Sequence, residues 1–264
     1  VHSPFQSDPR FIKNYESSKK PRSAKSFATL IEGIDKSLGD LMDHVKDKGV
    51  AENTLILFVG DNGSDGPLGD TYGYFSSAPL RGKKGTCYEG GMRVPFIASW
   101  AKEGKTNPFK IARNHLHHEQ IGTVMDIYST IVDASHSSSP AKYPVDGVSL
   151  LPQLSGKSNE ERPDQFMCHF PHSHRSSYFT SFRKGNWKLI YRYLTSGGKR
   201  KSKDPLPKYE LYNLKNDPYE TKNLAPGNSK KTNEMIRLMT KQLEDENALF
   251  PVRDDHELRP QLIQ

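Results

Sequence analysis

Two stretches of the sequence carry side chains that could bind an anion or the cation that neutralises it. The first contains Asp61 and Asn62, which follow the apolar run Thr54 to Val59 and precede Gly63. Carboxylate and amide oxygens are the ligands that a hard cation such as calcium prefers, but calcium takes about 6 to 8 of them. Asp61 and Asn62 are therefore a candidate for part of a calcium site. An ordinary turn is the alternative, because Asp, Asn and Gly all favour turns.

The second stretch is a glycine-rich basic loop. From Leu80 to Pro95 it reads LRGKKGTCYEGGMRVP. Glycine on both sides of the lysine pair lets backbone approach a tetrahedral anion, and an ammonium group can neutralise an oxyanion while charge moves onto a leaving oxygen. The order GxxxxGK[ST] of a nucleotide-binding P-loop does not occur in it. A flexible basic loop without a ligand is the alternative.

A histidine could supply the proton that a leaving alkoxide needs near neutral pH. His2, in the sequence His-Ser-Pro-Phe, is the candidate near the beginning of the chain. A single histidine in a loop is usually exposed and inert, so the residue type alone leaves both interpretations open.

The first half of the chain predicts the α/β arrangement that would position these residues. Residues 24 to 48 carry apolar side chains at the three-and-four spacing of a helix. The apolar run before Asp61 has strand length, residues 93 to 100 indicate a second buried strand, and residues 119 to 132 indicate a helix. A helix that returns into an all-apolar strand is typical of a mostly parallel sheet covered by helices on both faces. Ligands bind at the carboxyl ends of strands in such sheets, where Asp61 and Asn62 are expected.

The later part of the chain predicts a small antiparallel sheet with one covering helix. Gly185 and Asn186 are typical of the turn of a hairpin. The predicted elements are strands at 178 to 183, 187 to 193 and 209 to 214, and a helix at 229 to 249. Residues 135 to 164 are rich in Ser, Pro and Gly. We therefore expect a boundary between an α/β domain at 1–154 and a small α+β domain at 155–264.

Composition is that of a soluble globular protein. No window approaches the roughly 18 consecutive apolar residues of a membrane span, and the first residues lack the features of a signal peptide. The formal net charge of +7 is compatible with an anionic substrate, although basic runs such as GGKRKSK are also typical of solvated loops. Cys87 and Cys168 are too few for a disulfide framework and lack the spacing of a zinc site. The compartment therefore stays open.

The order of these segments resembles the type I sulfatases of the alkaline phosphatase superfamily. The matching stretches are NTLILFVGDNG, LRGKKGTCYEGGMRVP, MDIYSTIVDAS, DGVSLLPQL, GNWKLI and ELYNLKNDPYETKNLA. They span nearly the whole chain in the order of the family's motifs. The resemblance implies an alkaline phosphatase-like fold that is incomplete at the N-terminus, and the hydrolysis of sulfate esters with calcium as cofactor.

The resemblance also implies a role for each candidate residue. Asp61 and Asn62 match the family's calcium-binding pair. Lys84, the lysine directly before a glycine, matches the residue that contacts the sulfate group. His2 matches a histidine that contacts the sulfate ester and helps its leaving oxygen to depart.

The sequence departs from the family's pattern at several points. Lys83 stands where glycine is usual, and Gly60 stands where serine is common. The formylglycine motif Cys-x-Pro-Ser-Arg occurs nowhere in the chain, and neither does the early Asp-Asp pair of the calcium site. Because the matched segments are those of the family's later half, we expect the formylglycine on an upstream segment. The chain alone is then expected to be inactive.

The resemblance places one further segment near the substrate. His172, His174 and Arg175 lie in the sequence CHFPHSHR, and we hypothesise that they bind the sugar of a sulfated glycan. Exposed loop histidines are the alternative. We expect a sulfated carbohydrate as substrate, no nucleic acid, no membrane span, and, from the habit of the family, a periplasmic or secreted protein.

Two other functions remain open on the sequence. One is a phosphatase, phosphodiesterase or phosphonate hydrolase of the same superfamily. It is the weaker interpretation, because zinc-dependent relatives use Asp-His ligands where this chain has Asp61 and Asn62. The other is a noncatalytic module that binds polyanions, which the basic charge would support.

Overall fold

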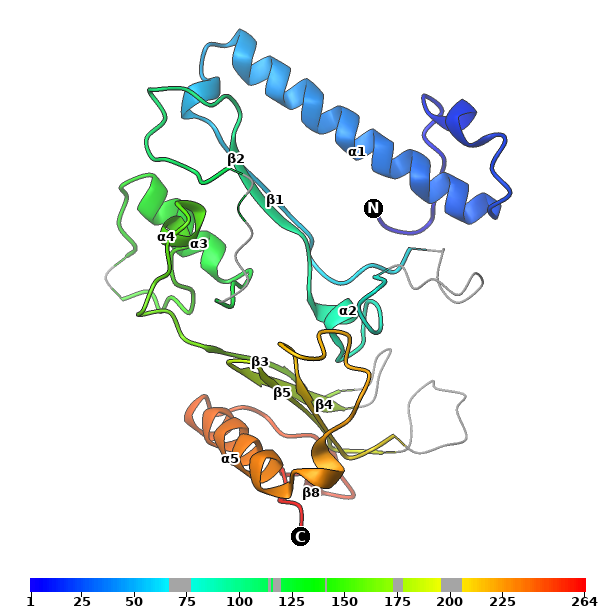
Figure 1. Cartoon of the computed structure of the whole chain (residues 1–264), viewed down its shortest axis with the longest axis vertical. Helices are drawn as coiled ribbons and strands as arrows, with labels where there is room; N and C mark the ends of the chain where they lie inside the picture. The colour runs from blue at the N-terminus through cyan, green and yellow to red at the C-terminus, as the bar shows by residue number, and fades with distance from the viewer. Residues whose placement is uncertain (67–76, 114, 116–119, 141, 173–177, 196–205) are drawn as a thin grey trace. The chain divides into compact units, whose positions relative to one another are not determined.

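The chain forms two compact units in the computed structural model (Figure 1). The structure describes residues 1–66, 77–113, 115, 120–140, 142–172, 178–195 and 206–264. The first unit comprises Val1–Asp61, Asp65–Ser76 and Pro95–Arg162, and the second comprises Asn62–Ser64, Ser77–Val94 and Pro163–Gln264. This division differs from the boundary expected between 154 and 155, because residues 62–64 and 77–94 group with the C-terminal part.

The longest helix of the first unit is α1, Arg22–Asp47, close to the predicted range. Asp8 and the 3-10 helix η1, Ile12–Tyr15, precede it. The backbone N–H of Asp8 donates to Thr29 Oγ1 at 3.0 Å, and the Tyr15 hydroxyl donates to Glu32 at 2.5 Å. The N-terminal segment is therefore held along one side of this helix.

Strand β1, Leu55–Val59, pairs with strand β2, Phe96–Trp100, in an antiparallel ladder. The sequence had favoured a mostly parallel sheet. A parallel pair needs a long crossover, usually a helix, whereas the described part of the connection between these strands contains only the four-residue helix α2, Glu89–Met92. An all-apolar composition reports burial but not strand direction, which explains the difference.

Helix α3, Asp126–Ala134, begins later than the predicted residue 119. The carboxylate of Asp126 reaches back to the backbone N–H of Thr123 at 2.7 Å. This contact is the half of a capping box in which an acidic side chain bonds the backbone N–H three residues earlier, and it holds the chain at the helix start. The same carboxylate accepts from Val148 N at 2.8 Å and from Arg162 Nη1 at 2.8 Å, so it also fixes the segment that leads to the short helix α4, Leu151–Leu154.

The second unit is built on a four-stranded antiparallel sheet with the order β3-β4-β5-β6. The strands are β3, Gln165–Phe170; β4, Phe179–Lys184; β5, Trp187–Arg192; and β6, Tyr209–Asn213. The predicted hairpin is confirmed as β4 and β5, and Gly185 in its turn has a φ of +54°, which glycine adopts without strain. Strand β3 was not predicted.

Helix α5, Ser229–Asp245, covers one face of this sheet as predicted (Figure 1). Residues of β5 alternate between the two faces, as in any strand. Leu189 and Tyr191 pack with Met235 and Met239 of the helix in the main apolar core. Lys188, Ile190 and Arg192 point to the other face, which carries the loop described below. A two-residue ribbon, β7 Val252–Arg253 with β8 His256–Glu257, follows the helix.

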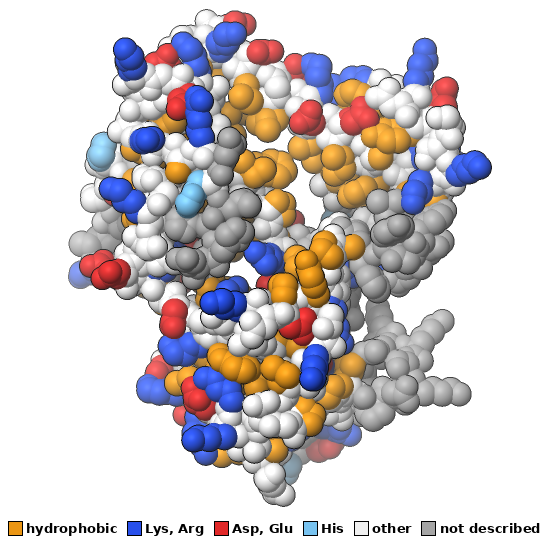
Figure 2. All heavy atoms as spheres, viewed as in Figure 1, with side chains coloured by type: hydrophobic (Ala, Val, Ile, Leu, Met, Phe, Trp, Pro, Cys, Tyr) orange, Lys and Arg blue, Asp and Glu red, His pale blue; other side chains and the backbone are white. Residues whose placement is uncertain are grey.

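On the face drawn in Figure 2, Lys and Arg side chains are scattered among acidic ones rather than gathered in a single patch. This distribution is that of an ordinary solvated surface. The structure has no helix, within the residues it describes, that is long and apolar enough to span a membrane.

Candidate active site

Asp61 and Asn62 follow the end of β1, as predicted. Gly60 N donates to Pro95 O at 3.1 Å, which holds the ends of the two strands of the first unit together. Both candidate side chains are exposed. The Asn62 amide nitrogen donates to Gly63 O at 3.1 Å, so the side-chain oxygen is the atom left to accept from, or coordinate, a ligand.

The segment 62–64 lies against the lysine loop through backbone contacts within the second unit. Gly63 N donates to Gly91 O at 3.0 Å, and Lys84 N donates to Ser64 O at 3.0 Å. A Cβ atom on Gly63 would lie 2.2 Å from the carbonyl oxygen of Gly90, a distance that no side chain tolerates. The two stretches that the sequence singled out are thus brought into contact by residues that must be glycine.

The lysine loop is folded tightly by its own backbone. Gly82 and Gly85 have φ angles of +81° and +82°, in the left-handed region that favours glycine. The Thr86 hydroxyl donates to Lys83 O at 2.9 Å, and Gly90 N donates to Arg81 O at 2.7 Å. Because the backbone is closed in this way, Lys84 projects from a defined loop and stays partly exposed.

A buried ionic cluster connects this loop to the sheet. The Lys188 ammonium of β5 lies 2.8 Å from Glu89 and 2.8 Å from Glu220, and its side chain is only 2% exposed. The backbone N–H of Glu89 also donates to Glu220 Oε2 at 2.7 Å. One lysine and one carboxylate of the C-terminal region therefore hold Glu89, the first residue of α2.

The charges of this cluster oppose the cost of their burial. Burial by itself would raise the pKa of Glu89, but the Lys188 ammonium and its hydrogen bond hold that pKa below its usual value. Burial would lower the pKa of Lys188, but the two carboxylates raise it. For Glu220 burial dominates, and its pKa is raised. Lys188 and Glu89 are consequently charged at neutral pH.

A second cluster holds the two residues before Glu89. Arg192 of β5 pairs with Glu210 of β6, and its Nη2 donates to the Tyr88 hydroxyl at 3.1 Å and to Cys87 Sγ at 3.3 Å. Arg81 stacks over the Tyr88 ring at 3.9 Å. Burial raises the pKa of the Cys87 thiol, which makes it a poor nucleophile. Cys87 therefore has a packing role.

The histidine candidates have different surroundings. His2 is an exposed residue of the first unit, and its Nδ1 lies 2.8 Å from Ser3 O. His172 is exposed and its ring lies 3.8 Å from that of Phe170 at the end of β3. His174 and Arg175 lie outside the described residues. His169, a residue of strand β3, bonds to Thr180 Oγ1 and Leu249 O at 2.8 Å each, which is a structural role.

The residues that the sequence reasoning missed are the charged side chains of the sheet. Lys188 and Arg192 lie in the stretch WKLIYR, and Glu210 and Glu220 lie in ELYNLKNDPYE. The available signal was alternation, because Lys188 and Arg192 share a face in a strand whose other face is apolar. That pattern usually indicates a solvent-exposed face, and only the structure shows the loop that covers this one.

The donor chemistry of Asp61 and Asn62 fits part of an oxygen-ligated cation site. Within the described ranges no group of three His, Cys, Asp or Glu residues could hold a metal ion. A carboxylate and an amide oxygen are ligands of the kind that calcium accepts, and further oxygens would have to come from other groups.

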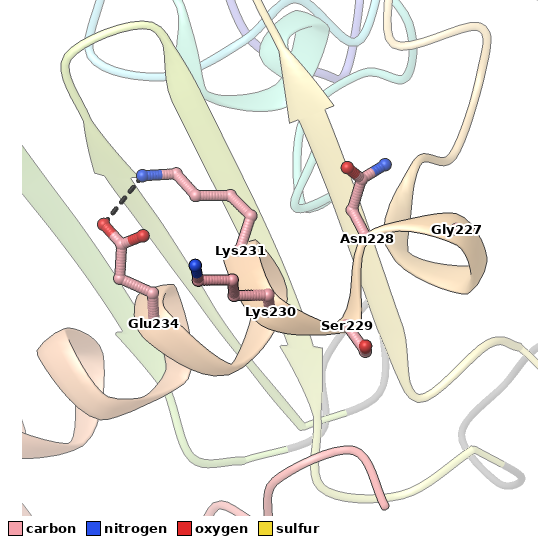
Figure 3. Close-up of a pocket in the computed structure, with 6 residues that line it drawn as sticks. All are labelled: Gly227, Asn228, Ser229, Lys230, Lys231 and Glu234. Atoms are coloured by element: carbon pink, nitrogen blue, oxygen red, sulfur yellow. Dashed lines mark hydrogen bonds and ion pairs between the residues drawn. The ribbon is translucent and has the colours of Figure 1, made fainter.

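A hollow at the start of α5 is a separate feature. It is lined by Gly227, Asn228, Ser229, Lys230, Lys231 and Glu234 (Figure 3). Lys231 pairs with Glu234 at 2.7 Å, and its ammonium lies 5.6 Å from the centre of the Trp187 ring. None of the predicted site residues lines this hollow, so it is not a candidate for the active site.

Two family models match the chain. The model described as "Sulfatase" matches residues 1–137, and the model described as "N-sulphoglucosamine sulphohydrolase, C-terminal" matches residues 82–248. The chain is 30% identical to a sulfatase of Formosa agariphila over 80% of its own length and 37% of that protein. It is 29% identical to human N-acetylgalactosamine-6-sulfatase over 60% of its length and 31% of that protein.

Solved structures show the same fold. The crystal structure of Ps i-CgsB in complex with k-i-k-neocarrahexaose matches 91% of this chain with a TM-score of 0.66 and 23% sequence identity. The match covers 47% of that chain, and this chain spans less than two fifths of the length of the two sulfatases compared above. Its fold class is alkaline phosphatase-like, as the sequence resemblance implied. With family models matched across both halves, the chain belongs to the sulfatase family.

Proposed function

We propose that this chain supplies part of the active site of a sulfuric ester hydrolase that acts on sulfated carbohydrate. The observation that carries the proposal is the packing of residues 62–64 against the Lys84 loop, with Lys84 N donating to Ser64 O at 3.0 Å. This contact fixes the backbone that bears one predicted cation ligand, Asn62, beside the backbone that bears the predicted sulfate-binding lysine.

The relatives support sulfated carbohydrate as the substrate class. One relative carries the name N-acetylgalactosamine-6-sulfatase, and one matching structure is a complex with k-i-k-neocarrahexaose. An exposed His172, whose ring is tilted by 39° against that of Phe170, would offer an aromatic surface and a hydrogen-bonding edge to a sugar. We propose that His172, with His174 and Arg175, contributes to sugar binding.

The chemistry assigned to the residues is electrostatic. Hydrolysis of a sulfate ester moves negative charge onto the leaving oxygen, and positive charge already in place stabilises the transition state. Lys84 would neutralise a sulfate oxygen, and His2 would donate a proton to the departing alkoxide. Asp61 and Asn62 would hold calcium, which when bound supplies further positive charge to the sulfate group. The formylglycine nucleophile is expected on an upstream segment.

A lysine comparison tests this function. In the protein at its natural length, Lys84→Met is expected to lower kcat/KM for a 6-sulfated N-acetylhexosamine by about 10²- to 10³-fold, the usual effect of removing one oxyanion donor. Lys83→Met, which removes the same charge one residue away, is the matched control and should change kcat/KM only a few-fold. Equal losses in the two variants would contradict the role of Lys84.

The competing functions give different results in the same assay. Hydrolysis of a phosphate ester in preference to its sulfate counterpart would favour a phosphatase or phosphodiesterase. Retention on heparin that survives Lys84→Met, without hydrolysis of any sulfate ester, would favour a polyanion-binding module. We also propose a periplasmic or secreted location, which fractionation of the producing cells would test.

A further inference from the structure

Three consecutive loop residues are each held by the sheet of the second unit. Cys87 and Tyr88 contact Arg192, and Glu89 contacts Lys188. These residues come three to five positions after Lys84. The loop is therefore fastened immediately beside the segment that carries its exposed ammonium.

The contacts that hold the loop are buried and ionic rather than apolar. The side chains of Glu89, Lys188 and Glu220 are only 10%, 2% and 0% exposed. A buried charge that loses its partner is far more costly than a lost surface contact, because no water replaces the partner. The cluster thus restricts the loop to one position, whereas an apolar contact would allow the loop to slide.

Hydrogen bonds carry this restriction from Glu89 back to Lys84. Glu89 begins α2, and Gly90 N donates to Arg81 O at 2.7 Å, which closes the loop. Gly91 O accepts from Gly63 N at 3.0 Å, and Lys84 N donates to Ser64 O at 3.0 Å. Every step in this series is a described contact inside one unit.

We infer that Lys188 is a positioning residue for the sulfate-binding loop, acting through Glu89 and Glu220 to fix where Lys84 stands. The inference rests on the proposed function for its catalytic consequence. Lys188 itself, enclosed by the two carboxylates, does not touch substrate. Its effect is geometric, since a misplacement of about 1 Å at a reacting group can cost on the order of 10²-fold in rate.

The test compares two neighbouring residues of β5 that face opposite ways. Lys188→Met removes the charge that holds the loop. Leu189→Ala is the matched control, because Leu189 is fully buried against α5 on the other face of the same strand. Glu220→Gln is a milder variant that retains an oxygen to accept the Glu89 N–H, in case Lys188→Met does not fold.

Hydrogen exchange in the protein at its natural length is the first readout. Lys188→Met and Glu220→Gln are expected to speed amide exchange in residues 82–92 by at least tenfold, while Leu189→Ala speeds exchange in β5 and α5 and leaves the loop protected. If all three variants changed the loop equally, or none did, the positioning role would be overturned.

Kinetics with a sulfated N-acetylhexosamine is the second readout. Lys188→Met is expected to lower kcat by about 10²-fold with a small change in KM, since substrate still binds but Lys84 is misplaced. Leu189→Ala should keep kcat at a temperature where it is folded. The inference would be refuted if Lys188→Met exchanged the amides of the loop faster and yet kept full activity. If the parent protein cleaves no sulfate ester, the proposed function fails, and the exchange experiment still decides whether Lys188 positions the loop.

Discussion

At the scale of single residues, the charges that matter most to this loop are concealed in the sheet. Lys188 lies between two carboxylates, and Arg192 lies between Glu210 and the Tyr88 hydroxyl. Such buried ionic groups stabilise a protein little more than apolar side chains of the same shape would. Removing one member of the group, however, strongly destabilises the fold. Their value is in specifying one arrangement of the chain.

Glu89→Gln is expected to lower the free energy of unfolding by about 1.5 to 3 kcal/mol at pH 7, the usual value of a hydrogen bond to a charged group. Because the folded-state pKa of Glu89 lies below its usual value, its contribution is complete above the unfolded pKa of about 4.3. The contribution is lost as pH falls through the lower folded pKa.

Urea denaturation of the parent chain and the variant between pH 3 and pH 7 would measure this dependence. The difference between them should shrink below about pH 4. Glu234→Gln is the control, because Glu234 is half exposed and pairs with Lys231 on the helix surface; it should change stability by less than about 0.5 kcal/mol. A difference that stays constant down to pH 3 would contradict the assignment.

At the scale of elements, the contact between residues 62–64 and the lysine loop depends on the absence of side chains. Gly63 lies against Gly90 and Gly91, and Gly91 lies against the carbonyl oxygens of Thr86 and Lys83. No rotamer change can relieve a clash with backbone, so these positions tolerate only glycine.

Gly63→Ala is therefore expected to destabilise the chain by about 1 to 3 kcal/mol, as overpacking does, and to loosen the Lys84 loop. Gly227→Ala is a matched control, because a Cβ there would meet no atom within 4 Å. Thermal unfolding and exchange of residues 82–92 would distinguish them. Equal stability of the two variants would show that the loop moves aside easily.

At the scale of the whole molecule, apolar burial is uneven. Both clusters of buried apolar side chains found among the described residues belong to the second unit. In the first unit, Phe58, Phe96 and Ile97 of the β1–β2 pair are 38%, 37% and 60% exposed. Burial of apolar surface is the main favourable term in folding, so the second unit has the larger share of it.

The protection of backbone amides from hydrogen exchange should follow this distribution of apolar burial. Amides of β4 and β5 are expected to exchange only by opening of the whole second unit, whereas those of β1 and β2 should exchange by smaller openings. Hydrogen exchange with mass spectrometry in the parent chain would rank the segments. Slower exchange in β1 and β2 than in β5 would contradict the prediction.

Much of this architecture could be predicted from periodicity. Helices α1 and α5 and the hairpin of β4 and β5 were predicted because their apolar spacing and turn residues are local signals. The direction of β2, the start of α3 and the existence of β3 were not, because each depends on contacts distant in sequence. The Asp126 carboxylate, for example, contacts Thr123, Val148 and Arg162 together.

For the candidate site, the sequence predicted which residues compose it. The types and spacing of Asp61, Asn62 and Lys84 indicated an anion site with a cation, and the structure shows residues 62–64 and the lysine loop in backbone contact. The roles of Asp61, Asn62, Lys84, His2 and His172 all stay predictions. The buried ionic cluster of Glu89, Lys188 and Glu220 could not be predicted, because a lysine in the stretch WKLIYR does not indicate which distant loop covers it.

The buried ionic cluster joins positions 99 and 131 residues apart in the sequence, since Glu89 contacts both Lys188 and Glu220. Its consequence concerns recombination between related genes. Where two parents differ at these positions, a hybrid that takes its lysine loop from one and its C-terminal strands from the other would pair unmatched charges inside the protein. Loop positions 87–89 and the partners at 188, 192, 210 and 220 would need to be exchanged together for such a hybrid to work.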